Sequence, residues 1–167
     1  RQQGTAFKYA SKDLRADRSL ALAAVEKDGN SLQFASEKLR ADPEIVAAAV
    51  GQKGTALKHA ALGLRSDSAM VLAAVRQDGN ALEWAGEALR RDTAIVCEAV
   101  QQNGNAVRFA SEDLRATPCI VLSAVRQTGN ALEHSALVAD RDVVLAAVSQ
   151  SGAALRHASS NFKADPQ

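Results

Sequence analysis

Glycine recurs along this chain at a fixed interval of 25 residues, with one final interval of 23. A period of about 20–50 residues is typical of solenoids, in which supersecondary units stack in a row and each unit contacts only its neighbours. We therefore expect residues 1–167 to form a single array. Its repeats should start near Gly4, Gly29, Gly54, Gly79, Gly104, Gly129 and Gly152.

Each repeat carries two helical patterns, as residues 29–53 illustrate. The first starts after Asn30, a residue type that caps helix N-termini, and ends near Arg40. The second starts after the capping residue Asp42 and is apolar almost all round at residues 45–50, so it should be buried. Short helices with short connections pack antiparallel. The expected fold class is all-α: an α-solenoid of about seven stacked helix–turn–helix repeats, with about thirteen short helices.

Several constant positions are predicted to hold the stack together. The glycine should end each second helix as a left-handed cap. A glutamine two residues before the glycine should bind the free carbonyls of that helix's last turn. The arginine column should pair with the capping aspartates, or, as the alternative, bind carboxylate or phosphate groups of a ligand. We define this arginine column as Arg15, Arg40, Arg65, Arg90 and Arg115.

The sixth repeat departs from the others because two residues are missing between Glu133 and Asp140. Its first helix should be about half a turn short, and the Leu-Arg step is absent. We expect a local kink in the rod there.

The repeated string Ala-Leu-x-x-Ala-Ser-x-x-Leu-Arg-x-Asp-x-x-(Ile/Val)-Val-Leu-Ala-Ala-Val-x-Gln-x-Gly resembles a known tandem repeat family, the domain of unknown function 4116. Residues 105–129 and 30–54 follow the pattern closely, and the resemblance covers the full chain. It implies a helical repeat array, and it implies no particular activity, because the family has none assigned.

One column of the repeat gathers most of the chain's rings. It lies five residues after each glycine and holds every histidine together with the only Trp and the only Tyr. In one interpretation each ring covers the seam between neighbouring first helices. In the other, the rings grip a peptide or another subunit, because aromatic anchors dominate interface energetics. We define this ring column as Tyr9, Phe34, His59, Trp84, Phe109, His134 and His157.

Beside the ring column runs a column whose charge changes sign along the array. A surface of constant shape and varied charge suits recognition of one particular protein partner. The two columns together are our predicted partner-binding site. We define this charge column as Lys8, Gln33, Lys58, Glu83, Arg108, Glu133 and Arg156.

Composition and motifs exclude several other classes of protein. The net charge is +1 with no run of like charge, so nucleic acid is not an expected partner. The sequence contains no stretch of about 18 apolar residues, so it predicts no membrane span. Phosphate loops and nucleophile or zinc-protease motifs are absent, so we expect no enzyme and no small-molecule substrate.

No cofactor or metal is expected either. His59, His134 and His157 have no Cys or carboxylate partner recurring at ligand spacing. A single histidine ligand to a haem remains open with nothing in its support. Cys97 and Cys119 occupy different columns of the second helix, where we expect them to fill core in a thiol-reduced compartment. This agrees with a soluble protein, intracellular or organellar, whose compartment the sequence leaves undetermined.

The sequence therefore predicts a non-catalytic interaction scaffold or a structural subunit of a larger assembly, binding partners through the first-helix face. Two alternatives stay open: an RNA-binding repeat with one ring per base, and the targeting arm of a multidomain enzyme. Solenoids need polar terminal repeats, and both ends of this sequence lack one. We therefore expect a segment of a longer array, or a subunit shielded by its neighbours.

Overall fold

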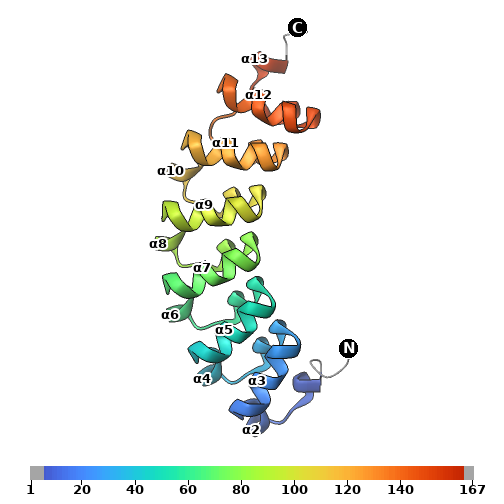
Figure 1. The fold of residues 1–167 in the computed structure, drawn as a ribbon, viewed down its shortest axis with the longest axis vertical. Coiled ribbons are helices and arrows are strands. Elements are labelled where there is room, and N and C mark those ends of the chain that lie inside the picture. The colour runs from blue at the N-terminus through green and yellow to red at the C-terminus, as the bar shows by residue number, and fades with distance from the viewer. Residues whose placement is uncertain (1–5, 164–167) are drawn as a thin grey trace.

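Long α-helices of ten residues follow one another along the stack (Figure 1). The structure is a computed structural model that describes residues 6–163. The predicted all-α solenoid is confirmed. The long helices are α3 (Arg18–Lys27), α5 (Pro43–Gln52), α7 (Ser68–Gln77), α9 (Thr93–Gln102), α11 (Pro118–Gln127) and α12 (Arg141–Gln150).

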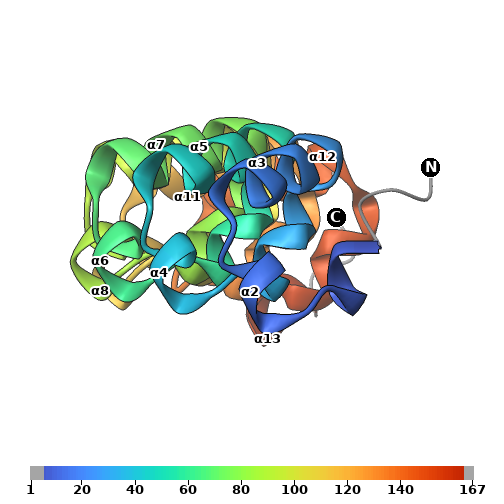
Figure 2. The same cartoon turned by 90° about the horizontal axis from the view of Figure 1, so that it is seen from below.

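The first helical pattern of each repeat is not one helix, as we expected, but two short segments. A 3₁₀ helix comes first: η1 (Phe7–Tyr9), η2 (Gly29–Phe34), η3 (Gly54–His59), η4 (Gly79–Trp84), η5 (Gly104–Phe109), η6 (Gly129–His134) and η7 (Gly152–His157). One turn of α-helix follows: α2 (Lys12–Arg15), α4 (Glu37–Arg40), α6 (Leu62–Arg65), α8 (Glu87–Arg90), α10 (Glu112–Arg115) and α13 (Ser160–Lys163). Seen along the long axis, the long helices lie on one side of the stack and the short α-helices on the other (Figure 2).

A backbone hydrogen bond between repeats explains the break. Ala35 and Ser36 are extended, with ψ angles of 154° and 157°. The Ser36 amide therefore makes no hydrogen bond within a helix. It donates instead to the carbonyl of Arg15 in the preceding repeat, at 2.9 Å. The same bond recurs down the stack, from Ala61 to Arg40 (2.8 Å), Gly86 to Arg65 (2.7 Å), Ser111 to Arg90 (2.9 Å) and Ala136 to Arg115 (3.0 Å).

Capping residues follow the prediction for the long helices but not for the 3₁₀ helices. Asp17, Asp42, Asp67, Asp92 and Asp140 each accept a bond from a first-turn amide, as expected. Thr117 does not; its hydroxyl donates to the Asp113 carbonyl instead, at 2.9 Å. Asp165, predicted to cap likewise, lies outside the described residues.

The predicted cap role of the Asn30 position is wrong. In some repeats the residue before the glycine performs it: Asp28 accepts a bond from the Asn30 amide, and Asp78 accepts one from the Asn80 amide, each at 2.9 Å. Lys53, Thr128 and Ser151, at the same position, make no such cap. The cap therefore stands two residues earlier than the sequence pattern suggested.

The repeating glycines also act differently from the prediction, because no described glycine has a positive φ. Their role is close approach. A Cβ built on Gly104 would lie 2.5 Å from the carbonyl oxygen of Ala124, and one on Gly129 would lie 2.5 Å from that of Ala147. The next long helix thus packs directly onto the glycine backbone, which only a residue without a side chain permits.

Glutamine side chains join consecutive long helices, so the prediction that each binds the last turn of its own helix is wrong. The Gln150 Oε1 accepts the Gly129 amide at 2.6 Å, and its Nε2 donates to the Gln127 carbonyl at 3.2 Å. Gln77 binds the Gly54 amide and the Gln52 carbonyl in the same way. The carbonyl that each of these glutamines satisfies belongs to the last turn of the preceding helix.

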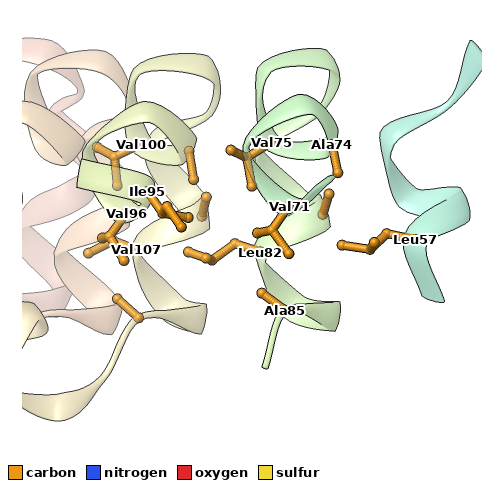
Figure 3. Close-up of a cluster of buried hydrophobic side chains, with 14 of the residues drawn as sticks. Leu57, Val71, Ala74, Val75, Leu82, Ala85, Ile95, Val96, Val100 and Val107 are labelled. Carbon is orange, nitrogen blue, oxygen red and sulfur yellow. The ribbon is translucent and has the colours of Figure 1, made fainter. Parts of the chain in front are cut away.

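The core lies between the long helices and the 3₁₀ helices (Figure 3). Leu57 and Leu82 from the 3₁₀ helices meet Val71, Val75 and Val96 from the long helices, all with side chains fully buried. Burying each such side chain contributes about 1.5–3 kcal/mol, so stacking supplies the stability that short isolated helices lack.

In the sixth repeat the two missing residues remove the short α-helix. A turn at residues 136–139 joins η6 to α12 directly. The inter-repeat bond survives, since the Ser159 amide donates to the Val138 carbonyl at 2.9 Å. Figure 1 shows α12 following α11 in the stack, so the irregularity lies in this turn. Within residues 6–163, none of the helices has the length and apolarity needed to cross a membrane.

Replacing Gly104 by Ala should destabilise the array by about 1–3 kcal/mol, because the new Cβ collides with the Ala124 carbonyl. The matched control is Gly51→Ala. Gly51 lies inside α5 with nothing within 4 Å of a built Cβ, so alanine should stabilise that helix by up to about 1 kcal/mol. Urea unfolding followed by circular dichroism measures both, and equal effects would contradict the close-approach role.

Gln77→Ala should cost about 1–3 kcal/mol of unfolding free energy, because the Gly54 amide and the Gln52 carbonyl lose their shared partner. Gln102 occupies the same position of the repeat and makes no hydrogen bond through its side chain within the described residues. Gln102→Ala should therefore stay within about 0.5 kcal/mol of the parent. If both substitutions cost the same in urea unfolding, the glutamine link is not stabilising.

Candidate functional site

Every ring of the ring column is the last residue of a 3₁₀ helix. The extended step that follows turns the chain away, so the rings form a row with one ring per repeat. Tyr9 is 81% exposed, whereas the other six rings are half-buried. Phe34, Trp84 and Phe109 pack against the hydrophobic core with part of each ring. The rest of each ring remains available at the surface.

One member of the arginine column, Arg65, binds a residue of this row. The Nε of Arg65 donates to the Trp84 carbonyl at 2.6 Å, and its guanidinium carbon lies 5.9 Å from the centre of the Trp84 ring. Arg65 thus holds the next repeat through both its backbone carbonyl and its side chain. None of the ion pairs between described residues involves the arginine column, so the predicted Arg–Asp pairing is wrong.

All seven members of the charge column are exposed, as their proposed role requires. Two of the cations lie over the ring of their own repeat: the Lys8 Nζ is 5.6 Å from the centre of Tyr9, and the Arg108 guanidinium carbon is 4.4 Å from that of Phe109. Lys58 and Glu83 make no ion pair within residues 6–163.

At the C-terminal end the two columns contact each other. The Nε of Arg156 donates to the Nε2 of His157 at 2.8 Å. The Nε2 of His157 also lies 3.8 Å from a carboxylate oxygen of Glu133. Val138 stands here where other repeats have the arginine. The Arg156 guanidinium is therefore engaged within the chain.

Two of the histidines have lowered pKa values. For His59 the main cause is burial, with the Lys58 and Arg40 charges adding to it. For His134 burial again lowers the pKa most; Glu133 opposes the change, and Arg108 and Arg115 reinforce it. Both imidazoles are therefore neutral rings at neutral pH, equivalent in charge to the phenylalanines of the column.

A small cleft beside Phe109 adds residues that the sequence did not single out. It has a volume of about 220 Å³ and lies between α8 and α10. Besides Phe109 and Arg90 it is lined by Glu87, Arg91 and Glu112, of which Arg91 lies 3.5 Å from the Glu87 carboxylate. These charges vary between repeats at positions flanking the Leu-Arg step, and that variation was the signal available in the sequence.

Within the described residues, no three His, Cys, Asp or Glu side chains gather closely enough to hold a metal ion. Cys97 is half-buried in α9, in line with a core-filling role. Cys119 is exposed on α11, so the prediction that it fills core is wrong.

Acidification should destabilise the array partly through His59 and His134. Their pKa values in the folded chain lie below the ordinary value of about 6.5, so the unfolded chain takes up protons first. Stability present above about pH 6.5 is then lost as the pH falls toward the folded pKa values. The double substitution His59→Phe and His134→Phe should flatten this loss in urea midpoints measured between about pH 7.5 and 5. An unchanged pH dependence would contradict the assigned burial.

Comparison with known proteins agrees with the geometry. The family model described as "Domain of unknown function (DUF4116)" matches residues 1–40, 17–65, 42–90, 67–115 and 92–137, in overlapping windows that each span about two of the 25-residue repeats. A search of curated proteins returned no match, and neither did a search of solved structures. The period, the stacked helices and these matches together show that the chain belongs to the DUF4116 family of tandem helical repeats.

Proposed function

We propose that this chain is a non-catalytic scaffold that binds a protein partner along the ring and charge columns. The observation that carries the proposal is the regular row of rings, half-buried except for Tyr9, each directly preceded in the sequence by an exposed side chain whose charge varies. Half-buried rings are held in place by the core, so they lose little conformational freedom on binding.

The charges of the charge column suggest which partner sequence would bind. Lys58, Glu83 and Arg108 present the order positive, negative, positive on three consecutive repeats. Packed helices lie about 8–10 Å apart and an extended chain advances about 3.3 Å per residue, so one repeat corresponds to about three residues of an extended partner. A partner segment with an acidic, a basic and an acidic residue at three-residue spacing would match this stretch.

Each repeat would then contribute one ring contact and one charge contact. The rings supply buried apolar area, and the charges select the partner and its register. Arg65 supports this arrangement by fixing the Trp84 carbonyl and covering one side of its ring. The remaining ring surface and the Glu83 carboxylate face the partner together.

The experiment is site-specific photo-crosslinking in an extract of cells that natively produce the protein. A photoreactive amino acid at Gln33 or Lys58, in the charge column, should capture a protein. The matched controls place it at Ala73 or Ser123, which are exposed on long helices away from the rings. With the captured partner in hand, Glu83→Lys should weaken binding about three- to tenfold, because a matched charge becomes a repulsive one.

Two results would contradict this function. Crosslinks arising equally from Ala73 and Ser123 would show that the ring row is not the binding surface. Crosslinks to RNA that disappear after ribonuclease treatment, with salt-dependent affinity, would favour base stacking on the rings instead.

A further inference from the structure

The two cysteines of the chain fall on neighbouring long helices. Cys97 is the fifth residue of α9, and Cys119 is the second residue of α11. Every other long helix has different residue types at both of these positions. The only two cysteines of the sequence therefore both lie at the junction between α9 and α11.

The register of the stack indicates that these two positions face each other. At the preceding junction Arg76, the ninth residue of α7, forms an ion pair of 2.9 Å with Glu98, the sixth residue of α9. Moving four residues, about one helical turn, toward the N-terminus on both helices gives the fifth residue of one helix and the second of the next. At the α9–α11 junction these residues are Cys97 and Cys119.

The first turns of neighbouring long helices are in contact as well. Arg18, the first residue of α3, pairs with Glu44, the second residue of α5, and lies 3.2 Å from the Asp42 carboxylate. On the first helix of such a pair, the fifth residue lies midway between the ion-paired first and ninth residues. On the next helix, the second residue is the one that Arg18 reaches at its own junction. The thiols also interact electrostatically: burial raises the pKa of Cys97, and the neighbouring Cys119 raises it further.

The two thiols differ in access. Cys119 is exposed beside a shallow depression lined by Val100, Gln101 and Ser123, whereas Cys97 is half-buried in the junction. An exposed thiol reacts first with a small oxidant, and a nearby second thiol resolves the adduct. This is the arrangement of an attacking and a resolving cysteine.

We propose that Cys97 and Cys119 are a redox modification site, forming a disulfide that links the fourth and fifth repeats. The oxidant is a small disulfide such as oxidised glutathione. The Cys119 thiolate attacks one of its sulfurs, forms a mixed disulfide and releases one glutathione thiolate. The Cys97 thiolate then attacks the Cys119 sulfur, forms the protein disulfide and releases the second glutathione. The two protons of the cysteine thiols pass to the two glutathione thiolates, and the protein loses two electrons.

The test treats the full 167-residue chain with oxidised glutathione and measures its intact mass without reductant. The monomer should lose the mass of two hydrogens and yield one linked peptide pair containing Cys97 and Cys119. Cys97→Ser and Cys119→Ser should instead each retain one glutathione. Two glutathione adducts on the parent chain, or disulfide-linked dimers, would overturn the proposal.

Moving one thiol tests whether the disulfide forms because the two cysteines face each other, or only because the chain is flexible enough to bring any two thiols together. In the variant Cys119→Ser with Arg126→Cys, the exposed thiol moves about two turns along α11 and should give mixed disulfides only. An internal disulfide formed as readily in this variant would overturn the assigned register. The oxidised parent should also unfold at a temperature higher by roughly 5 °C or more, reversed by reductant, and an unchanged Tm would overturn the link between repeats.

Discussion

The hydrogen bond between the backbones of consecutive repeats governs the rest of this architecture. An amide in the extended step, such as that of Gly86, donates to the carbonyl of the preceding repeat's arginine. For that amide to be free, the first helical pattern must break into a 3₁₀ helix and a single α-turn. The break in turn places a ring at the end of each 3₁₀ helix and brings the preceding arginine beside it. Structure and surface therefore arise from one repeated contact.

The long helices depend on a second, complementary contact. The long helices α5, α7, α9, α11 and α12 each pack an alanine carbonyl onto the glycine that starts their repeat, and in several repeats a glutamine ties the glycine amide to the previous helix end. With backbone contacts on both sides of the stack, the constant residues are committed to architecture. What varies is the charge column, together with charged positions such as Arg91 around the Phe109 cleft. Variation on a rigid frame is what a recognition surface needs, and it is the basis of the function proposed for the chain.

The sequence predicted the period, the buried long helices and most of their aspartate caps because apolar periodicity and capping chemistry are local signals. The break at Ala35 and Ser36 was hidden, since its cause is a partner about 20 residues away in the preceding repeat. Ser36 and Ser111 followed by glutamate were the available hint, because serine is a preferred N-cap residue and an acidic residue is favourable in the first turn of a helix. The contacts of Arg65 and the exposure of Cys119 depend on how repeats stack, which no single repeat reveals. The role of the ring and charge columns in binding stays a prediction.

Amide hydrogen exchange of the folded chain tests the inter-repeat bond most directly. The amides of Ala61, Gly86 and Ser111 lie outside any helix, yet each donates to an arginine carbonyl of the preceding repeat. The amides of Glu87 and Glu112 follow at the starts of short helices, where amides have no helical partner. We expect Gly86 and Ser111 to exchange at least about tenfold more slowly than Glu87 and Glu112. Equal exchange rates for the two sets would contradict the account of how the repeats are joined.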